Sequence, residues 1–198
     1  MGKFNMKKIL IAIIFLLLCL SDSYAFLSKT KEIDPNEYPF LLIAKNLQIY
    51  DIELDLSGAS EKAYRKKWIN GAYDIKYEYD RRDSDNFDPL FFSTKLEVDK
   101  SIAKAKETYR DGLKVITKMS SVAGMPCREI KNIIQWGDEN YYALRLKEGN
   151  AVGMIFSGRL KNKVYTIIMA GLYSSDHSLM VDLVIPKLQS IDSFQIKE

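Results

Sequence analysis

Nucleophilic or acid–base chemistry in this sequence would rest on His177 and Cys127. His177 is the single histidine of the chain and lies in the run Ser174-Ser175-Asp176-His177-Ser178. A catalytic triad draws its members from distant segments, so we expect a surface or capping role for this histidine. Cys127 begins an expected strand, where a small buried apolar side chain is the first interpretation. The alternatives are a reactive thiol, an intermolecular disulfide, or a Cys127–His177 pair of nucleophile and base.

A calcium loop is the main metal hypothesis that the sequence offers. The segment 80–88 is rich in carboxylates, and Asp83 and Asp85 match the first positions of an EF-hand loop. Asp88 stands where that loop needs glycine, and Thr94 stands where it needs a bidentate glutamate. We therefore expect a solvated loop between strands, and the sequence predicts no metal and no cofactor.

Basic residues recur every four positions in one segment, at Lys106, Arg110, Lys114 and Lys118. On a helix this spacing places them along one face that drifts slowly around the axis. Acidic neighbours partly neutralise this basic stripe, so a solvated helix face is the first interpretation. The alternative is a docking surface for an acidic partner or an anionic membrane, and these four residues are our candidate binding residues.

Tyrosines are concentrated in the expected strands. Because tyrosine suits a half-buried sheet face, packing in the core is the default role. The alternative is an aromatic-lined ligand groove between sheet and helix. The six residues concerned are Tyr73, Tyr77, Tyr79, Tyr141, Tyr142 and Tyr165.

The first 25 residues predict where this chemistry takes place. Lys7 and Lys8 precede the apolar run 9–20, and Ser23-Tyr24-Ala25 places small residues where a signal peptidase reads. This order is typical of a secretory signal peptide, with cleavage after Ala25. We expect export across the inner membrane into the periplasm.

Three other readings of this N-terminus bear on that expectation. A membrane anchor needs about 20 apolar residues, and the run here is shorter. A bulky leucine before Cys19 disfavours lipidation, and Met6 is an alternative start. We therefore expect no membrane span after cleavage.

Composition limits the mature chain to a nearly neutral, disulfide-free domain. The leader holds three lysines and one aspartate, so 26 basic and 25 acidic residues remain, a formal charge of about +1. This balance gives no argument for binding nucleic acid. With one cysteine, an intrachain disulfide is impossible, so the core must hold the fold.

Hydrophobic periodicity predicts an α+β domain over residues 47–198, after an irregular lead-in at 26–46. The expected antiparallel sheet has six to seven strands and is flanked by a long helix and a C-terminal helix. The segment 57–67 reads as a polar connection. Strands are expected near 47–56, 74–80, 90–98, 128–136, 140–147, 151–158 and 163–170.

Two helices and a meander complete the expected architecture. Residues 101–121 show apolar spacings of three and four, with Asp99 or Ser101 as the cap. The last four strands have short polar connections, which predict a four-strand meander. A final amphipathic segment starts near 174–176. Pro186 leaves open a short strand at 179–185 followed by a helix with this proline in its first turn.

This order of elements resembles the Mog1/PsbP-like α/β/α sandwich family over about residues 47–194. The resemblance is carried by the runs Gly153-Met154-Ile155-Phe156, Lys163-Val164-Tyr165-Thr166-Ile167 ahead of Gly171, and Ile191-Asp192-Ser193-Phe194. It implies a non-enzymatic binding or assembly factor, which is an argument by analogy.

We therefore expect a secreted or periplasmic binding module that contacts a protein partner in the cell envelope or a ligand, without turnover. The alternatives are an immunity-type inhibitor of a secreted toxin and a small periplasmic hydrolase. The hydrolase would use carboxylates or the Cys127/His177 pair.

Overall fold

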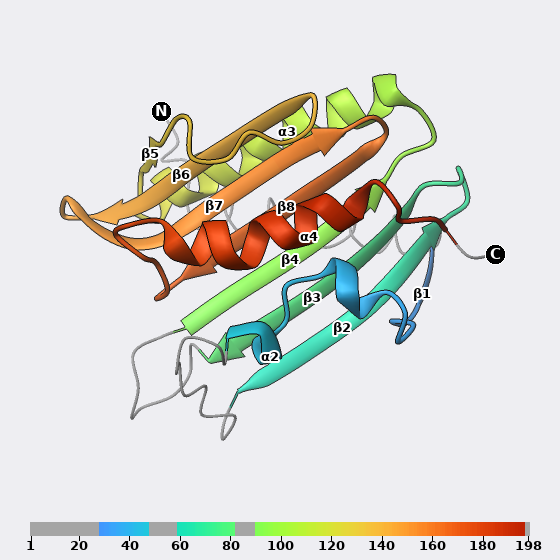
Figure 1. The fold of residues 1–198 in the computed structure, drawn as a ribbon, viewed down its shortest axis with the longest axis horizontal. Helices are drawn as coiled ribbons and strands as arrows, with labels where there is room; N and C mark the ends of the chain where they lie inside the picture. Colours follow the sequence, from blue (N-terminus) through green and yellow to red (C-terminus); the bar gives the residue numbers. More distant parts are fainter. Residues whose placement is uncertain (1–27, 48–58, 82–89, 197–198) are drawn as a thin grey trace, which may run out of the picture.

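Eight antiparallel strands form one sheet in the computed structural model, which describes residues 28–47, 59–81 and 90–196 (Figure 1). Across the sheet their order is β1-β2-β3-β4-β8-β7-β6-β5. The strands are β1 (Ser28–Glu32), β2 (Ser60–Trp68), β3 (Tyr73–Arg81), β4 (Leu90–Val98), β5 (Cys127–Glu129), β6 (Glu139–Lys147), β7 (Asn150–Leu160) and β8 (Lys163–Ala170).

The mixed α+β class and the C-terminal four-strand meander are confirmed, but the count of six to seven strands is wrong. Both β1 and β2 lie where an irregular lead-in and a polar connection were expected. Most residues of β2 are charged and none is buried, so its sequence lacks the apolar alternation of a strand; Arg65 lies 3.9 Å from Glu37, and Lys66 lies over the Trp68 ring. The strand predicted at 47–56 falls almost wholly outside the described residues.

Helical elements cover both faces of the sheet (Figure 1). The long helix α3 (Ile102–Val122) packs on β7 and β8 and touches β5. The opposite face carries η1 (Tyr38–Phe40), α2 (Ala44–Leu47), η3 (Met180–Val184) and α4 (Ile185–Ile191). None of the described helices is long and apolar enough to span a bilayer.

The main core lies between the sheet and α4. Alternate residues of β3 point to this side, because successive side chains of a strand face opposite ways. Tyr73, Tyr77 and Tyr79 are buried there, and Tyr142 and Tyr165 on the other half of the sheet join them. The packing role expected for these five tyrosines is confirmed.

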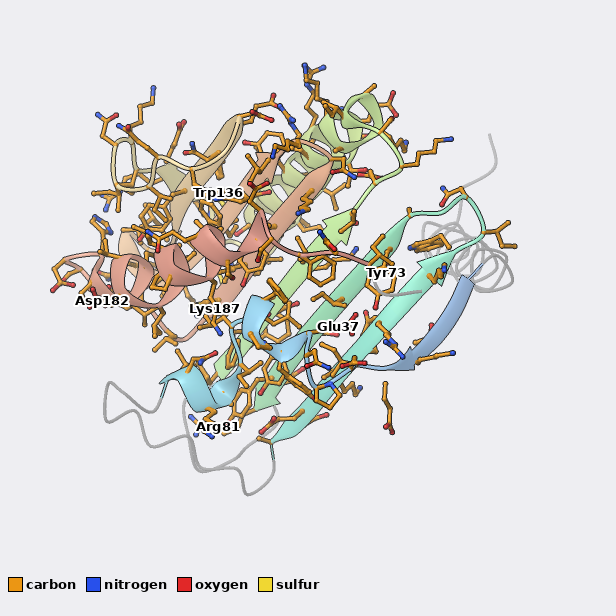
Figure 2. The ribbon with its side chains drawn as sticks, turned by 45° about the vertical axis from the view of Figure 1, so that its right-hand side comes forward. Glu37, Tyr73, Arg81, Trp136, Asp182 and Lys187 are labelled. Atoms are coloured by element: carbon orange, nitrogen blue, oxygen red, sulfur yellow. The ribbon has the colours of Figure 1, made fainter. Side chains whose placement is uncertain are left out.

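The lead-in to the domain is part of this core. Leu41 and Leu42 are fully buried. The carboxylate of Glu37 accepts a hydrogen bond from the Tyr73 hydroxyl, and the two residues lie together in Figure 2. Thr94 Oγ1 donates to the Leu42 carbonyl at 2.9 Å. The segment before residue 47 is therefore bonded to β3 and β4.

Ser101 caps α3, as one of the two expected caps, by accepting a hydrogen bond from the Lys104 amide at 3.2 Å. Gly124 follows the helix with φ +72°, a conformation that glycine adopts at little cost, and so ends it. The strand expected at 128–136 ends at Glu129, and Asn132 has φ +66°, which extended strand geometry excludes.

The C-terminal segment is helical from Met180, so the alternative strand at 179–185 is wrong. Pro186 lies in the first turn of α4, where its missing N–H costs little, and the preceding turn η3 has the wider π geometry. The end of α4 is fixed by Lys163, which donates to the carbonyls of Ile191 and Asp192 at 2.8 and 2.7 Å. Lys187 donates to the Pro39 carbonyl and joins α4 to η1.

Candidate functional site

Helix α3 contacts the sheet through a narrow strip of apolar side chains. Ala105 and Tyr109 are buried against Val164 of β8, with Leu113 partly buried beside them. These positions recur at spacings of four along the helix, so they occupy one face, and both flanks stay clear of the sheet. A recess therefore runs along each side of the helix.

The recess toward β5 and β6, which we call the cysteine groove, has a volume of about 610 Å³. Its apolar and aromatic surface comes from Tyr109, Leu113 and Tyr141, and its rim from the helix. The full lining is Tyr109, Arg110, Leu113, Lys114, Thr117, Ser121, Pro126, Cys127 and Tyr141.

Two of the four residues of the basic stripe line this groove. All four are exposed, and Arg110 and Lys114 belong to the lining while Lys106 and Lys118 do not. Because 3.6-residue turns make a four-residue repeat drift around the helix axis, only the middle of the stripe borders the groove. Two of the four candidate binding residues therefore lie in the same groove as Cys127, which follows the helix.

Cys127 is half-buried rather than buried, which corrects the first interpretation of this residue. It lies at the start of the edge strand β5, and the open groove beside it leaves the thiol side uncovered. Its partner in register is Arg145 of β6. The thiol and this arginine therefore share the face of the sheet on which α3 lies.

Arg145 was missed as a residue that shapes this site. Its side chain is buried and donates to Ser120 Oγ at 3.0 Å and to the Met169 carbonyl at 3.4 Å. Burial lowers its pKa, and among the described residues no carboxylate pairs with it. The sequence offered one signal for this role, because Arg145 is a charged residue within the otherwise apolar middle of β6.

Arg145 also stabilises the connection between α3 and β5, which comes just before Cys127. Ser120 in the last turn of α3 donates to the Met125 carbonyl at 2.5 Å, and Arg145 reaches the Met125 sulfur at 3.6 Å. One buried guanidinium thus joins the end of the helix to the sheet. These contacts hold the backbone in place at the Cys127 end of the groove.

His177 lies on the other side of the sheet. Its Nδ1 is 2.9 Å from the hydroxyl of Tyr142, and the two rings meet edge to face. Tyr142 and Arg145 are an odd number of residues apart on β6, so they point to opposite faces. Cys127 and His177 are therefore separated by the sheet and do not form a nucleophile and base.

The residues around His177 serve the backbone. Ser174 Oγ accepts a hydrogen bond from the Leu179 amide at 3.1 Å, and Asp176 accepts bonds from Ser178. The His177 carbonyl accepts from the Met180 amide at 3.0 Å. These bonds lie within the turn before η3, whose N-cap residue Leu179 has no side-chain cap, and the His177 ring is bonded to Tyr142 instead.

Residues 82–89 of the candidate calcium loop lie outside the part of the chain that the structure describes. In the part of the chain that the structure does describe, no three histidine, cysteine or carboxylate side chains are grouped to hold a metal ion.

Comparison with protein-family models, with curated proteins and with solved structures gave no match. The resemblance to the Mog1/PsbP-like family stays a prediction from three short runs of sequence.

Proposed function

We propose that this chain is a non-enzymatic binding module of the cell envelope that takes an acidic segment of a protein partner into the cysteine groove. The observation that carries the proposal is the lining of this groove. Arg110 and Lys114 are its two charged residues, and both are cations. Complementary charge attracts and orients a partner of opposite sign.

The apolar part of the groove supports a peptide as the ligand. Tyr109 and Tyr141 offer ring surface next to the two cations, and Leu113 adds an aliphatic side chain. Aromatic residues and arginine are the side chains most enriched in protein interfaces. An acidic segment with an apolar or aromatic residue would use both properties of the groove.

The shape of the site favours a chain segment over a membrane. A bilayer presents a broad surface, whereas the two cations line a recess between the helix and β5–β6. The module would therefore act by recognition in the periplasm, in line with the signal peptide expected at residues 1–25.

Charge reversal tests this proposal. We expect the double variant Arg110→Glu, Lys114→Glu to bind a fluorescent acidic decapeptide about tenfold more weakly, because exposed ion pairs contribute up to about 1 kcal/mol each and tenfold corresponds to about 1.4 kcal/mol. Fluorescence anisotropy at two salt concentrations measures the effect.

The double variant Lys106→Glu, Lys118→Glu is the matched control, since it makes the same charge change on the same helix outside the groove. Equal losses in the control and in Arg110→Glu, Lys114→Glu would refute the groove as the site. A second readout is alkylation of Cys127, followed by mass spectrometry of its peptide. Bound decapeptide should slow this reaction, and an unchanged rate would place the peptide elsewhere.

A further inference from the structure

We propose that the recess on the other flank of α3 binds a neutral polyhydroxylated ligand of the saccharide class. This recess, which we call the hydroxyl cleft, lies between α3 and strands β3, β4, β7 and β8 and has a volume of about 450 Å³. Sites for small molecules typically span about 300–1,000 Å³. The cleft lies on the opposite flank of α3 from the cysteine groove and shares only Tyr109 with its lining, so this inference does not depend on the function proposed above.

The floor of the cleft is a polar row that crosses four adjacent strands. Lys76 of β3 is paired in register with Lys95 of β4, which is paired with Thr166 of β8 and, through it, with Ser157 of β7. Residues paired in this way point to the same face of a sheet. All four line the cleft, and Ser93 lines it beside them.

Hydroxyl groups dominate this floor at depth. Ser157 is 1% exposed and Ser93 is 7% exposed. The hydroxyl oxygens of Ser157 and Thr166 are 3.3 Å apart. A hydroxyl has one hydrogen to donate and two lone pairs to accept, so this single contact leaves both hydroxyl groups with capacity for further hydrogen bonds.

The charges of the cleft cancel. Lys76 and Lys95 are matched by Glu97 and Asp111 in the lining. Lys95 Nζ is 2.8 Å from Glu97 Oε1, so donors and acceptors stand side by side as a fixed pair. Such a surface gives no net attraction to an anion or a cation. It suits a neutral ligand whose own groups both donate and accept, which is the chemistry of sugar hydroxyls.

The helix supplies the apolar wall of the cleft. Val115 and Ile116 of α3 line the cleft, and Val164 and Ile168 of β8 add apolar surface to it. A pyranose ring has the same division, because C–H groups form its faces and hydroxyls form its edge. The cleft can therefore contact the ring faces through aliphatic side chains and the hydroxyls through the floor.

Gly112 keeps the cleft open at the middle of the helix. A Cβ at this position would meet no atom within 4 Å, so packing does not require glycine there. Glycine in a helix interior costs up to about 1 kcal/mol relative to alanine. Here the absent side chain leaves space in the lining itself, since Gly112 borders the cleft.

The test is ligand titration of the full chain by calorimetry and saturation-transfer-difference NMR. Glucose and N-acetylglucosamine probe free monosaccharides, chitotriose probes a glycan chain, and succinate and choline are charged controls. Ligands are taken to about 10 mM, tenfold above a Kd of about 1 mM. Binding of monosaccharides supports a free sugar, and binding of chitotriose alone supports a glycan. Binding of none of the three, or of a charged control in their place, overturns the proposal.

Two variants locate the site. Gly112→Leu fills the cleft with a better helix former, so the fold is retained, and we expect saccharide affinity to fall at least tenfold. Ala103→Leu adds the same bulk at an exposed position of α3 outside both recesses and should leave saccharide affinity unchanged. Equal affinity in Gly112→Leu and the wild type refutes the site. Binding of the acidic decapeptide should persist in Gly112→Leu, which separates failure of this inference from failure of the proposed function.

Discussion

Buried polar side chains of this molecule join its layers. Arg145 connects the last turn of α3 to the sheet, Lys163 holds the end of α4, and Glu37 fixes the lead-in through Tyr73. In each case the partner comes from a different element, and a buried polar group without a partner would cost roughly 1–3 kcal/mol. These residues therefore position the elements around the two recesses.

Tyr142 gives a prediction for alkaline pH. Burial raises the pKa of its phenol from the ordinary value of 10.0 to about 12. The neutral phenol is thus favoured by folding: its contribution to stability is complete below pH 10 and is lost as the pH rises through about 12. We expect Tyr142→Phe to be about 1 kcal/mol less stable at neutral pH, where it loses the bond to His177.

Urea unfolding of both proteins between about pH 8 and 12 measures this difference, which should shrink as the phenol of the wild type ionises. The ultraviolet absorbance of phenolate, followed in the same titration, should lose one late-ionising tyrosine in the variant. A stability difference that is constant over the whole range would contradict the assignment.

Close packing of neighbouring strands determines where glycine is required. Gly153 of β7 lies against β8, and a Cβ built there would overlap the Met169 carbonyl oxygen. Gly112 of α3 is the opposite case, because its missing side chain borders open space. Helix and sheet thus use the same residue for different reasons, close backbone approach in β7 and an open recess beside α3.

The substitution of alanine for these two glycines should have opposite signs. We expect Gly153→Ala to lower the free energy of unfolding by about 1–3 kcal/mol, because the strands must move apart. Gly112→Ala should raise it by up to about 1 kcal/mol through helix propensity. Chemical denaturation of the two variants makes the comparison, and destabilisation by both would show that α3 needs its glycine for packing.

On the scale of the whole molecule, the chain before residue 47 completes the core. Leu41 and Leu42 are fully buried in the same cluster as the strands of both halves of the sheet. Helix α4 and η1 meet over this cluster. The face that carries α4 is thus closed by segments from both ends of the described chain, while the face that carries α3 keeps the two recesses.

Replacing Leu42 with alanine tests the place of the lead-in in the core. We expect Leu42→Ala to cost about 2–5 kcal/mol, the range for large-to-small changes at fully buried positions. Lys45→Ala, an exposed change in the same segment, should stay within about 0.5 kcal/mol. Thermal and urea unfolding give both values, and a small effect of Leu42→Ala would mean that the lead-in packs only loosely.

Elements with a local pattern could be predicted from the sequence alone. Strand β3 alternates with period two, strands β4, β6, β7 and β8 are runs of strand-forming residues between polar segments, and α3 has apolar spacings of three and four with a serine cap, so each was predicted within a few residues. The basic stripe was visible for the same reason. Strands β1 and β2 were missed because they are rich in charged residues and show no apolar alternation.

Which chemical groups meet depends on the packing of the elements in three dimensions. This packing placed Arg110 and Lys114 beside Cys127, kept His177 on the opposite face, and lined up Lys95, Thr166 and Ser157 across three strands. The pairing of β4 with β8 joins residues such as Lys95 and Thr166 that are tens of positions apart, and local periodicity does not contain this register. Both proposed sites depend on how the sheet and α3 come together.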